Sequence, residues 1–458
     1  MYYSKILLNN FRGFCASAPI NLAPLTFLVG PNSSGKSSIF DALLLISQSG
    51  FGPTSQTARE PNWQGALVDL GSYKDTVYKH DIDKEITLAT EVVWKEGDPP
   101  MYGIKPPTGE ASARFEMRLE CAGRTDPIGR LVELRITDCT NGATLAFSYS
   151  ADDPTKVTLE FLGRKRSRRI DPLPSGTFYF RKWVQQSVEE ILKDKTPSDK
   201  PTVGTLLFFS ATAVFNNFVA RVQRIASGRL GPKRWYSATT AKSSRTLRGL
   251  YDGIDPQMLE EIRKSEEKHI RQQQTRNRQR IASVLKQLEI ASAVKDVQLS
   301  PYHTSISVKD SVTKVVSNLI DVGYGASQVI PVILGCLSRS TSPLLVEQPE
   351  IHLHPRAQGT VAELLCSTSK QRQVIVETHS EHMINRARIL VAQGKLNPSD
   401  VLINYVKRDK NGSTVEPITI QKNGDFSRDW PEGFFDERYR DTMELIDLKN
   451  KATKRKAR

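Results

Sequence analysis

A glycine-rich loop near the N-terminus has the residue types and spacing that bind a nucleoside triphosphate. Residues 30–37 read Gly-Pro-Asn-Ser-Ser-Gly-Lys-Ser. Glycine lets backbone N–H groups turn onto phosphate oxygens, Lys36 can reach the β- and γ-phosphates, and Ser37 can hold Mg²⁺. The apolar run 25–29 and the helical pattern 37–46 predict the strand–loop–helix context that this motif requires. We predict a site for ATP and Mg²⁺ formed by Gly30, Pro31, Asn32, Ser33, Ser34, Gly35, Lys36, Ser37 and Ser38.

An acidic residue ends a second apolar run, at residues 344–347. A phosphate-binding loop needs a carboxylate at the end of another strand to coordinate magnesium, usually through water. Glu347 is therefore predicted as the metal residue that acts with Ser37. The next residue, where a catalytic base is expected, is Gln348, whose amide can orient water but cannot accept its proton. Glu350 is the alternative base if the following turn brings it close.

Lys36, Glu347 and Gln348 are the catalytic candidates named so far. Two further segments could complete the site, and the second adds His379 to these candidates. A glycine-rich turn containing Gly323 and Gly325 opens an apolar helix and brings Ser327 and Gln328 to a second anion-binding turn. The second segment is the apolar run 374–376, which His379 follows closely, where a histidine can sense a γ-phosphate.

Four of the seven histidines, His352, His354, His379 and His382, lie in one short stretch. A transition-metal site is an alternative for this group. No second-shell pattern or cysteine supports that alternative, and structural histidines are the interpretation we favour for His352 and His382.

Composition limits the classes of protein that remain. The 458 residues carry a formal net charge of +14, and 38% of them are hydrophobic, as in a folded globular chain. No apolar run approaches the roughly 20 residues that cross a bilayer, and no signal peptide is visible, so we expect no membrane contact and a cytoplasmic protein. Five scattered cysteines indicate neither a zinc site nor disulfides. Basic groups at 164–169, 263–280 and 449–458 make DNA a candidate partner, although no motif that reads bases is present.

The pattern along the chain predicts an α/β fold in four regions. An N-terminal lobe at 1–205 combines the phosphate-binding loop with an antiparallel β region, and 206–295 forms a basic helical insertion. Residues 296–410 form a C-terminal ATPase lobe with the second glycine turn, the acidic strand and His379. A short C-terminal domain with a basic tail occupies 411–458.

In combination, these motifs resemble the SMC-like branch of ABC-type ATPases, which includes RecF, OLD-family and anti-phage defence ATPases. The order of the motifs carries this likeness: the phosphate-binding loop, the turn at 323–328, the acidic strand with its Gln-Pro-Glu-Ile-His-Leu-His-Pro continuation, and Glu-Thr-His-Ser-Glu-His at 377–382. Within that branch, the chain is similar to bacterial AAA-type ATPases that end in a short domain of unknown function. The segments that carry this closer likeness are 70–75, 231–234 and 430–437.

The resemblance implies an ABC/SMC-type head that dimerises around two ATP molecules. Residues 323–328 would be the signature that contacts ATP on the opposite protomer, and His379 would be the switch histidine. His354 would lie in a loop that crosses the dimer interface. Phe11 and Arg12 resemble residues near the nucleotide, and an ordinary hairpin remains the alternative for them.

The resemblance favours a slowly hydrolysing ATPase switch in anti-phage defence, with the toxic activity in a separate effector nuclease subunit. Expected partners are a second copy of the chain, that effector, and DNA through the basic groups. Two alternatives stay open: a non-hydrolysing ATP-gated scaffold or sensor, which Gln348 favours, and a RecF-like DNA repair ATPase. A transporter subunit fits poorly because the chain offers no obvious coupling surface.

Overall fold

The computed structural model describes most of the chain, with gaps. It covers residues 1–16, 18–49, 60–96, 98, 109–121, 123, 129–139, 142–150, 156–161, 163–169, 187, 190, 222–229, 232–237, 270–300, 303–338, 340–431, 441–446 and 448. Of the features predicted above, much of the helical insertion, Gly231, residues 432–437 and the basic tail lie outside these residues.

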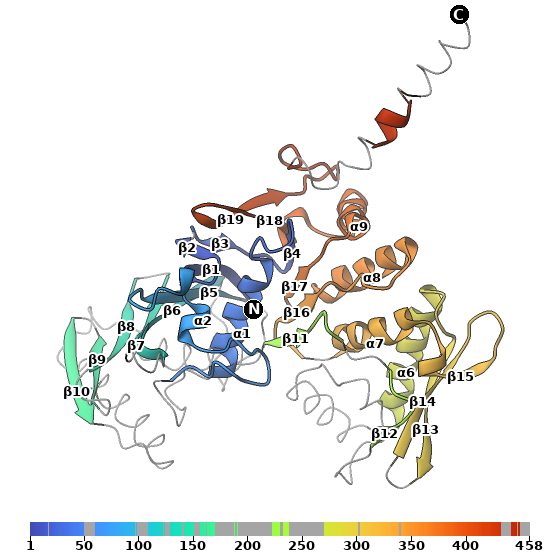
Figure 1. Ribbon diagram of the computed structural model, residues 1–458, viewed down its shortest axis with the longest axis horizontal. Helices are drawn as coiled ribbons and strands as arrows, with labels where there is room; N and C mark the ends of the chain where they lie inside the picture. The colour runs from blue at the N-terminus through green and yellow to red at the C-terminus, as the bar shows by residue number, and fades with distance from the viewer. Residues whose placement is uncertain are drawn as a thin grey trace, which may run out of the picture.

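A six-stranded sheet has the strand of the phosphate-binding loop near its centre (Figure 1). Only the last two strands pair antiparallel; the other neighbours are parallel. The short central strands are buried along their whole length, as expected where both faces of a parallel sheet are covered. The strand order is β11 (Gln223–Ile225), β16 (Leu344–Glu347), β17 (Val374–Glu377), β4 (Leu25–Val29), β18 (Val401–Asp409) and β19 (Gly412–Thr419).

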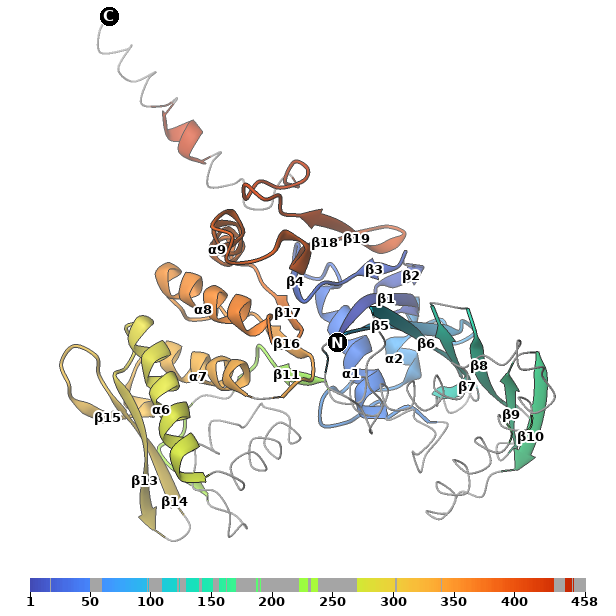
Figure 2. The ribbon, with the colours of Figure 1, turned by 180° about the vertical axis from the view of Figure 1, so that it is seen from behind.

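Each face of this sheet belongs to a different hydrophobic core. Leu28, Leu345 and Ile375 pack in one core with helix α1 (Lys36–Ser49) and the antiparallel lobe. Their neighbours along the same strands, such as Phe27, pack in a second core with the helices on the other face. Those helices are α7 (Tyr324–Leu337), α8 (Pro355–Thr368) and α9 (Glu381–Ala392) (Figure 2).

A nine-stranded antiparallel sheet forms the lobe beyond α1 (Figure 1). Its strands pair mostly with their neighbours in the sequence, as hairpins do, and its free edge is the basic strand β10. The short helix α2 (Tyr73–Thr76) connects it to the loop region. The strands are β1 (Tyr2–Phe11), β2 (Phe14–Ala16), β3 (Ile20–Asn21), β5 (Ile86–Lys95), β6 (Glu110–Cys121), β7 (Gly129–Asp138), β8 (Thr144–Tyr149), β9 (Lys156–Phe161) and β10 (Arg164–Arg169).

A third unit stands beside α7 and combines one helix with a small antiparallel sheet (Figure 2). Its elements are α6 (Ile270–Gln287), β12 (Tyr236–Ser237), β13 (Ala293–Ser300), β14 (His303–Lys309) and β15 (Val316–Asn318). Three 3₁₀ turns, Tyr78–His80, Leu319–Asp321 and Pro398–Asp400, complete the described elements.

The predicted fold class is confirmed in its architecture: the chain is α/β with an antiparallel β lobe. Two of the predicted region boundaries differ from the way the strands pair. Strand β11 lies in the region predicted as an insertion, yet it pairs with β16 in the six-stranded sheet. The boundary predicted after residue 410 falls in the turn of the β18–β19 hairpin. Parallel pairing joins segments far apart in sequence, so local composition could not place these boundaries. In the part of the chain that is described, no helix is long and apolar enough to cross a bilayer.

Candidate nucleotide site

The phosphate-binding loop connects β4 to α1 and depends on glycine at two positions. Gly30 and Gly35 have φ angles of +143° and +109°, which side-chain-bearing residues rarely adopt. A Cβ atom on Gly30 would lie 2.1 Å from the carbonyl oxygen of Val406, and one on Gly35 would lie 2.7 Å from Oγ of Ser413. The loop is therefore held tightly against β18 and β19, which explains the glycine spacing seen in the sequence.

Lys36 begins helix α1, and its side chain folds back over the loop. Its Nζ donates hydrogen bonds to the carbonyl oxygens of Gly30, at 3.0 Å, and Pro31, at 2.8 Å. Burial lowers the pKa of Lys36, while the nearby carboxylate of Glu377 favours the charged form. The ammonium group is thus held at the N-terminus of a helix, where phosphate oxygens are stabilised.

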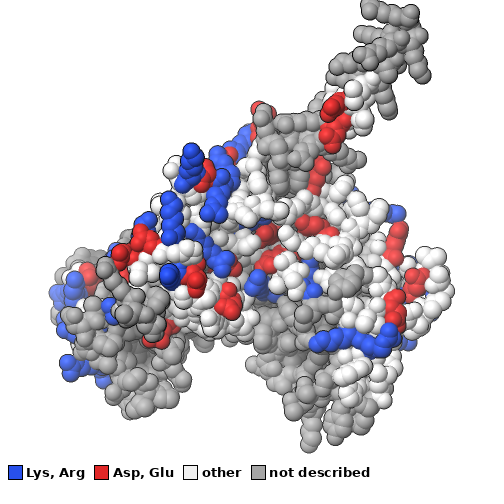
Figure 3. Space-filling view, viewed as in Figure 1, with Lys and Arg blue, Asp and Glu red and all other residues white. Residues whose placement is uncertain are grey.

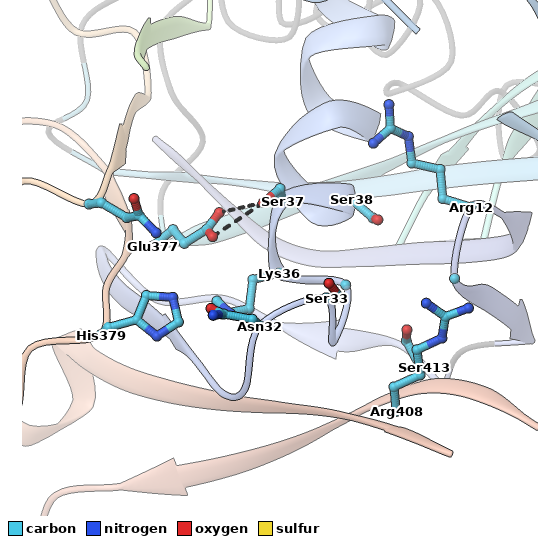
Figure 4. A pocket seen from close by; sticks show the side chains of 13 residues that line it. Arg12, Asn32, Ser33, Lys36, Ser37, Ser38, Glu377, His379, Arg408 and Ser413 are labelled. Atoms are coloured by element: carbon cyan, nitrogen blue, oxygen red, sulfur yellow. Dashed lines mark hydrogen bonds between the residues drawn. The ribbon is translucent and has the colours of Figure 1, made fainter. Parts of the chain in front are cut away.

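An open pocket of about 440 Å³ lies in front of the loop. In Figure 4, Glu377 and His379 lie on one side of the loop, and Arg12, Arg408 and Ser413 lie on the other. The pocket is therefore acidic at one end and basic at the other. Its lining consists of Arg12, Gly13, Asn32, Ser33, Gly35, Lys36, Ser37, Ser38, Gln348, Glu377, His379, Arg408 and Ser413.

The carboxylate that faces Ser37 belongs to Glu377, a residue to which the sequence analysis assigned no role. The Ser37 hydroxyl donates to the two carboxylate oxygens of Glu377 at 2.9 and 3.2 Å. Burial raises the pKa of Glu377, while Ser37 and Lys36 act in the opposite direction. A hydroxyl beside a carboxylate is an oxygen donor set of the kind that Mg²⁺ prefers. The available signal was an apolar run ending in an acid at 374–377, the pattern that had selected Glu347.

Glu347 occupies a different environment from the predicted one. Strand β16 is separated from β4 by β17, so the end of β17 is the one beside the loop. The Glu347 carboxylate contacts the guanidinium of Arg224 at 2.7 Å and accepts from N and Oγ of Ser227 at 3.0 and 3.1 Å. It is not among the pocket-lining residues. In this geometry Ser37 and Glu377 form the oxygen pair, and the predicted pairing of Ser37 with Glu347 is not formed.

Gln348 and His379 do line the pocket, at the ends of β16 and β17. Burial, together with the positive charge of Lys36, lowers the pKa of His379, which favours the neutral imidazole. Glu350 has another use: its Oε1 accepts the backbone N–H of His379 at 2.7 Å, and it does not line the pocket. The side chain at the position expected for a catalytic base is therefore an amide.

The residues of the predicted signature lie at the start of α7, outside the pocket lining. Gly323 is exposed, whereas Ser327 and Gln328 are only 3% exposed. Gly325 lies close to the backbone of His352, since a Cβ on Gly325 would lie 2.7 Å from the His352 carbonyl oxygen. The predicted role of these residues towards a second protomer stays a prediction.

A buried arginine connects this segment to the pocket. Arg229 donates through Nε to Oε1 of Gln328 at 3.4 Å, and through its guanidinium to the backbone oxygen of Gln348 at 2.8 Å. Burial lowers the pKa of Arg229 to about 10. The sequence offered no signal for this residue, because neither its partners nor its burial can be read locally.

Arginines from two hairpins form the basic side of the pocket. Arg12, in the β1–β2 turn, lines the pocket as its resemblance suggested, and its guanidinium contacts Asp41 of α1 at 2.7 Å. Phe11 is fully buried and belongs to the core. Arg408 and Ser413, on the β18–β19 hairpin, were not predicted because only the fold brings that hairpin to the loop.

Comparison with protein families finds three matches along this chain. The family "AAA ATPase domain" matches residues 1–105, and "AAA domain, putative AbiEii toxin, Type IV TA system" matches 232–385. A "Protein of unknown function" family matches 396–445. The two AAA matches include the phosphate-binding loop, both acidic strands and His379.

The two AAA matches together support an AAA-type ATPase. Among solved structures, an SMC head bound to the C-winged helix domain of ScpA is similar to the ATPase with a TM-score of 0.46 and 14% identity, over 92% of this chain and 99% of that chain. The SMC head domain from Thermotoga maritima gives a TM-score of 0.36 and 12% identity, over 91% and 99%. A search of curated proteins found no match.

One histidine of the histidine-rich stretch, His354, has a structural contact at the start of a helix. His354 precedes α8, and its Nδ1 accepts the backbone N–H of Arg356 at 3.3 Å. Within the described ranges, no three His, Cys, Asp or Glu side chains are grouped as metal ligands.

The raised pKa of Glu377 predicts a pH-dependent gain in stability on its neutralisation. A carboxyl group with a folded-state pKa above its unfolded value stabilises the fold at low pH, and this contribution is lost as pH rises through the folded pKa. Glu377→Gln should therefore raise the urea midpoint of the ATPase at pH 7 and leave it nearly unchanged below about pH 4. The control is Glu444→Gln, at an exposed position. Equal effects at both pH values would contradict the burial argument.

Proposed function

We propose that this chain binds ATP with Mg²⁺, hydrolyses it slowly, and acts as a switch that closes as a dimer. The observation that carries the proposal is the convergence of Lys36, Ser37 and Glu377 on one pocket. Lys36 would neutralise phosphate charge, and the oxygens of Ser37 and Glu377 would hold the metal ion. The metal supplies further charge neutralisation when it is bound.

The acidic and basic ends of the pocket would set the orientation of a bound triphosphate. Its γ-phosphate end would lie near Glu377, Gln348 and His379, and its nucleoside end would lie towards the arginines. A neutral His379 can donate or accept one hydrogen bond, which suits a group that senses the terminal phosphate.

Slow turnover follows from the amide at residue 348. Gln348 can orient the attacking water, but it cannot take its proton. Glu350 is engaged with the backbone of His379, and Glu377 is engaged with Ser37. No carboxylate of the pocket lining is thus free for proton transfer within the described part of the chain. ATP would be held for a long time before cleavage.

Dimerisation is supported by the position of the signature segment. Gly323 and Gly325 lie outside the chain's own pocket, so a second copy is needed to bring them to a nucleotide. The link from Gln328 through Arg229 to Gln348 provides a route by which that contact would influence the pocket.

The broader role proposed is a DNA-linked process, most strongly anti-phage defence with a separate effector nuclease subunit. Its support is the motif resemblance, the net charge of +14 and a family match whose description names a toxin–antitoxin system. Co-purification with a nuclease encoded beside this chain would support the proposal. A neighbourhood of recombination genes would instead favour a RecF-like repair ATPase.

A second candidate function is an ATP-gated scaffold that does not hydrolyse its ligand. The specific observation in its favour is again Gln348, which lines the pocket at the position expected for a base. Phosphate release separates the two candidates, since a scaffold would dimerise on ATP without turnover.

Loss of Lys36 tests the ATPase directly. Lys36→Ala should abolish phosphate release and ATP-dependent dimerisation, because the triphosphate loses its main countercharge, while the exposed control Lys370→Ala keeps both. Malachite-green assays measure turnover, and light scattering with and without ATP measures mass. A Lys36→Ala protein that still turns over ATP would contradict the site; a wild type that dimerises without turnover would favour the scaffold.

A carboxylate at residue 348 should accelerate turnover. Gln348→Glu places a proton acceptor in the pocket and is expected to raise kcat by about 10²-fold, the low end of general-base effects. Gln393→Glu makes the same chemical change at an exposed position outside the pocket lining and should change nothing. An unchanged kcat in Gln348→Glu would show that proton transfer does not limit the reaction.

DNA binding through strand β10 would appear in the salt dependence of affinity. Arg166 and Arg168 share one face of this exposed edge strand, which stands out as a basic margin in Figure 3. Replacing both by Ala should reduce the slope of log Kd against log salt by about 2, since each phosphate contact contributes about 0.9. Replacing Lys370 and Lys395 by Ala serves as the matched control. Equal slopes in the two variants would exclude β10 as the DNA surface.

A further inference from the structure

We propose that the β18–β19 hairpin is a nucleotide-contacting arm, in which Arg408 binds the phosphate next to the nucleoside and Ser413 binds the same ligand. This inference rests on the proposed ATP site, and it extends that site to the region matched only by a family of unknown function. Three independent features of the hairpin support it.

The hairpin is docked against the β1–β2 turn and Tyr78, and its Ser413 lies against Gly35 of the phosphate-binding loop. The N–H of Ser413 donates to the carbonyl oxygen of Gly13 at 2.7 Å, and the Tyr78 hydroxyl donates to the carbonyl oxygen of Asn411 at 3.2 Å. Gly412 is buried, and a Cβ there would lie 2.8 Å from the same Gly13 oxygen. Contacts this close fix the hairpin relative to the loop, so side chains on it can be part of a defined site.

Arg408 supplies a cation to the pocket that no described carboxylate neutralises. Arg12, the other arginine there, contacts Asp41 at 2.7 Å, so its charge is already partly compensated. Arg408 is exposed, lines the pocket and has no ion pair within the described residues. Figure 3 shows Lys and Arg side chains gathered over β18 and β19, which adds to the positive potential at this end.

Ser413 adds a buried polar atom with no partner. Ser413 is 2% exposed, and its Oγ makes no hydrogen bond with any described group. A buried hydroxyl left without a partner is destabilising, so such an atom calls for an explanation. Oγ faces the loop closely, since a Cβ on Gly13 or Gly35 would come within 2.7 Å of it. A phosphate or ribose oxygen entering the pocket would satisfy this donor.

The direction of the pocket determines which part of the ligand Arg408 meets. Ser37, Glu377 and His379 mark the metal and γ-phosphate end, and Arg408 lies on the opposite side of the loop (Figure 4). The guanidinium therefore meets the phosphate nearest the nucleoside, which ATP, ADP and AMP share. A charged hydrogen bond of this kind stabilises a complex more than a neutral one.

The hairpin also gives the C-terminal region a contact with the nucleotide. The family of unknown function matches residues 396–445, which include both strands. Glu416 on β19 pairs with Lys407 and with Arg428 beyond the hairpin, and the Ser427 hydroxyl accepts the N–H of Thr419 at 3.1 Å. Binding at Arg408 would thus restrain the segment that follows β19.

Calorimetric titration of the full chain with Mg-ATP and with AMP tests the proposal. Arg408→Ala should weaken both ligands by about 10-fold or more, as expected for a charged hydrogen bond. The matched control is Lys407→Ala, the adjacent cation on the other face of β18, whose surface ion pair with Glu416 contributes little. This control should remain within about twofold of wild type. Ser413→Ala should weaken Mg-ATP binding without lowering the thermal midpoint, because its hydroxyl has no partner in the protein.

The outcomes separate this inference from the proposed function. A wild type that does not bind Mg-ATP would overturn the ATP site itself. Normal wild-type binding with equal affinities in Arg408→Ala and Lys407→Ala would overturn the role of Arg408 alone. A loss confined to Mg-ATP, with AMP binding unchanged, would contradict its placement near the nucleoside. Hydrogen exchange of residues 410–431 should slow on ATP binding in wild type and not in Arg408→Ala, and equal exchange in both would contradict the coupling.

Discussion

The hydrogen bond between the Ser37 hydroxyl and Glu377 depends on one structural constraint, the parallel pairing of β17 with β4. That pairing sets Glu377 in register with Leu28, just before the loop, and brings the carboxyl end of β17 to the first turn of α1. The carboxyl ends of parallel strands meet along one edge of a sheet, where α/β proteins bind their ligands. Lys36, Ser37, Gln348, Glu377 and His379 all reach the pocket from this edge.

The same constraint explains why the glutamate that contacts Ser37 is not the one that the sequence selected. Leu344–Glu347 and Val374–Glu377 are both apolar strands that end in glutamate, and they are register neighbours. Which glutamate faces the loop is decided by strand order, and strand order results from long-range pairing. The phosphate-binding loop, in contrast, was readable, because its glycine positions, lysine and serine act within eight consecutive residues. Gln348 and His379 were also readable, since Gln348 directly follows a buried strand and His379 follows another after one intervening residue.

Pocket residues that lie on hairpins could not be predicted from the local sequence. Arg408 sits in an exposed run of charged residues, and nothing in that run distinguishes it from Lys407 or Lys410. It becomes part of the pocket because β18 pairs with β4 on the side away from β17, and because β19 then folds back towards the β1–β2 turn. Arg224 and Arg229 were likewise invisible, since their roles depend on β11 joining a sheet formed mainly by distant segments.

The electrostatics of the pocket oppose the stability of the protein. Burial raises the pKa of Glu377 and lowers those of Lys36 and His379, so each group is held in an environment that disfavours its charged form. Burial also raises the pKa of Asp41, to about 6, although Arg12 contacts it. A chain selected for stability alone would fill such positions with neutral side chains. A bound triphosphate with its metal would reverse much of this penalty, because it supplies anions to Lys36 and the arginines and a cation to Glu377. The proposed Mg-ATP ligand would act against the burial cost of each of these groups, and its binding would then be coupled to the order of the elements that meet at the pocket.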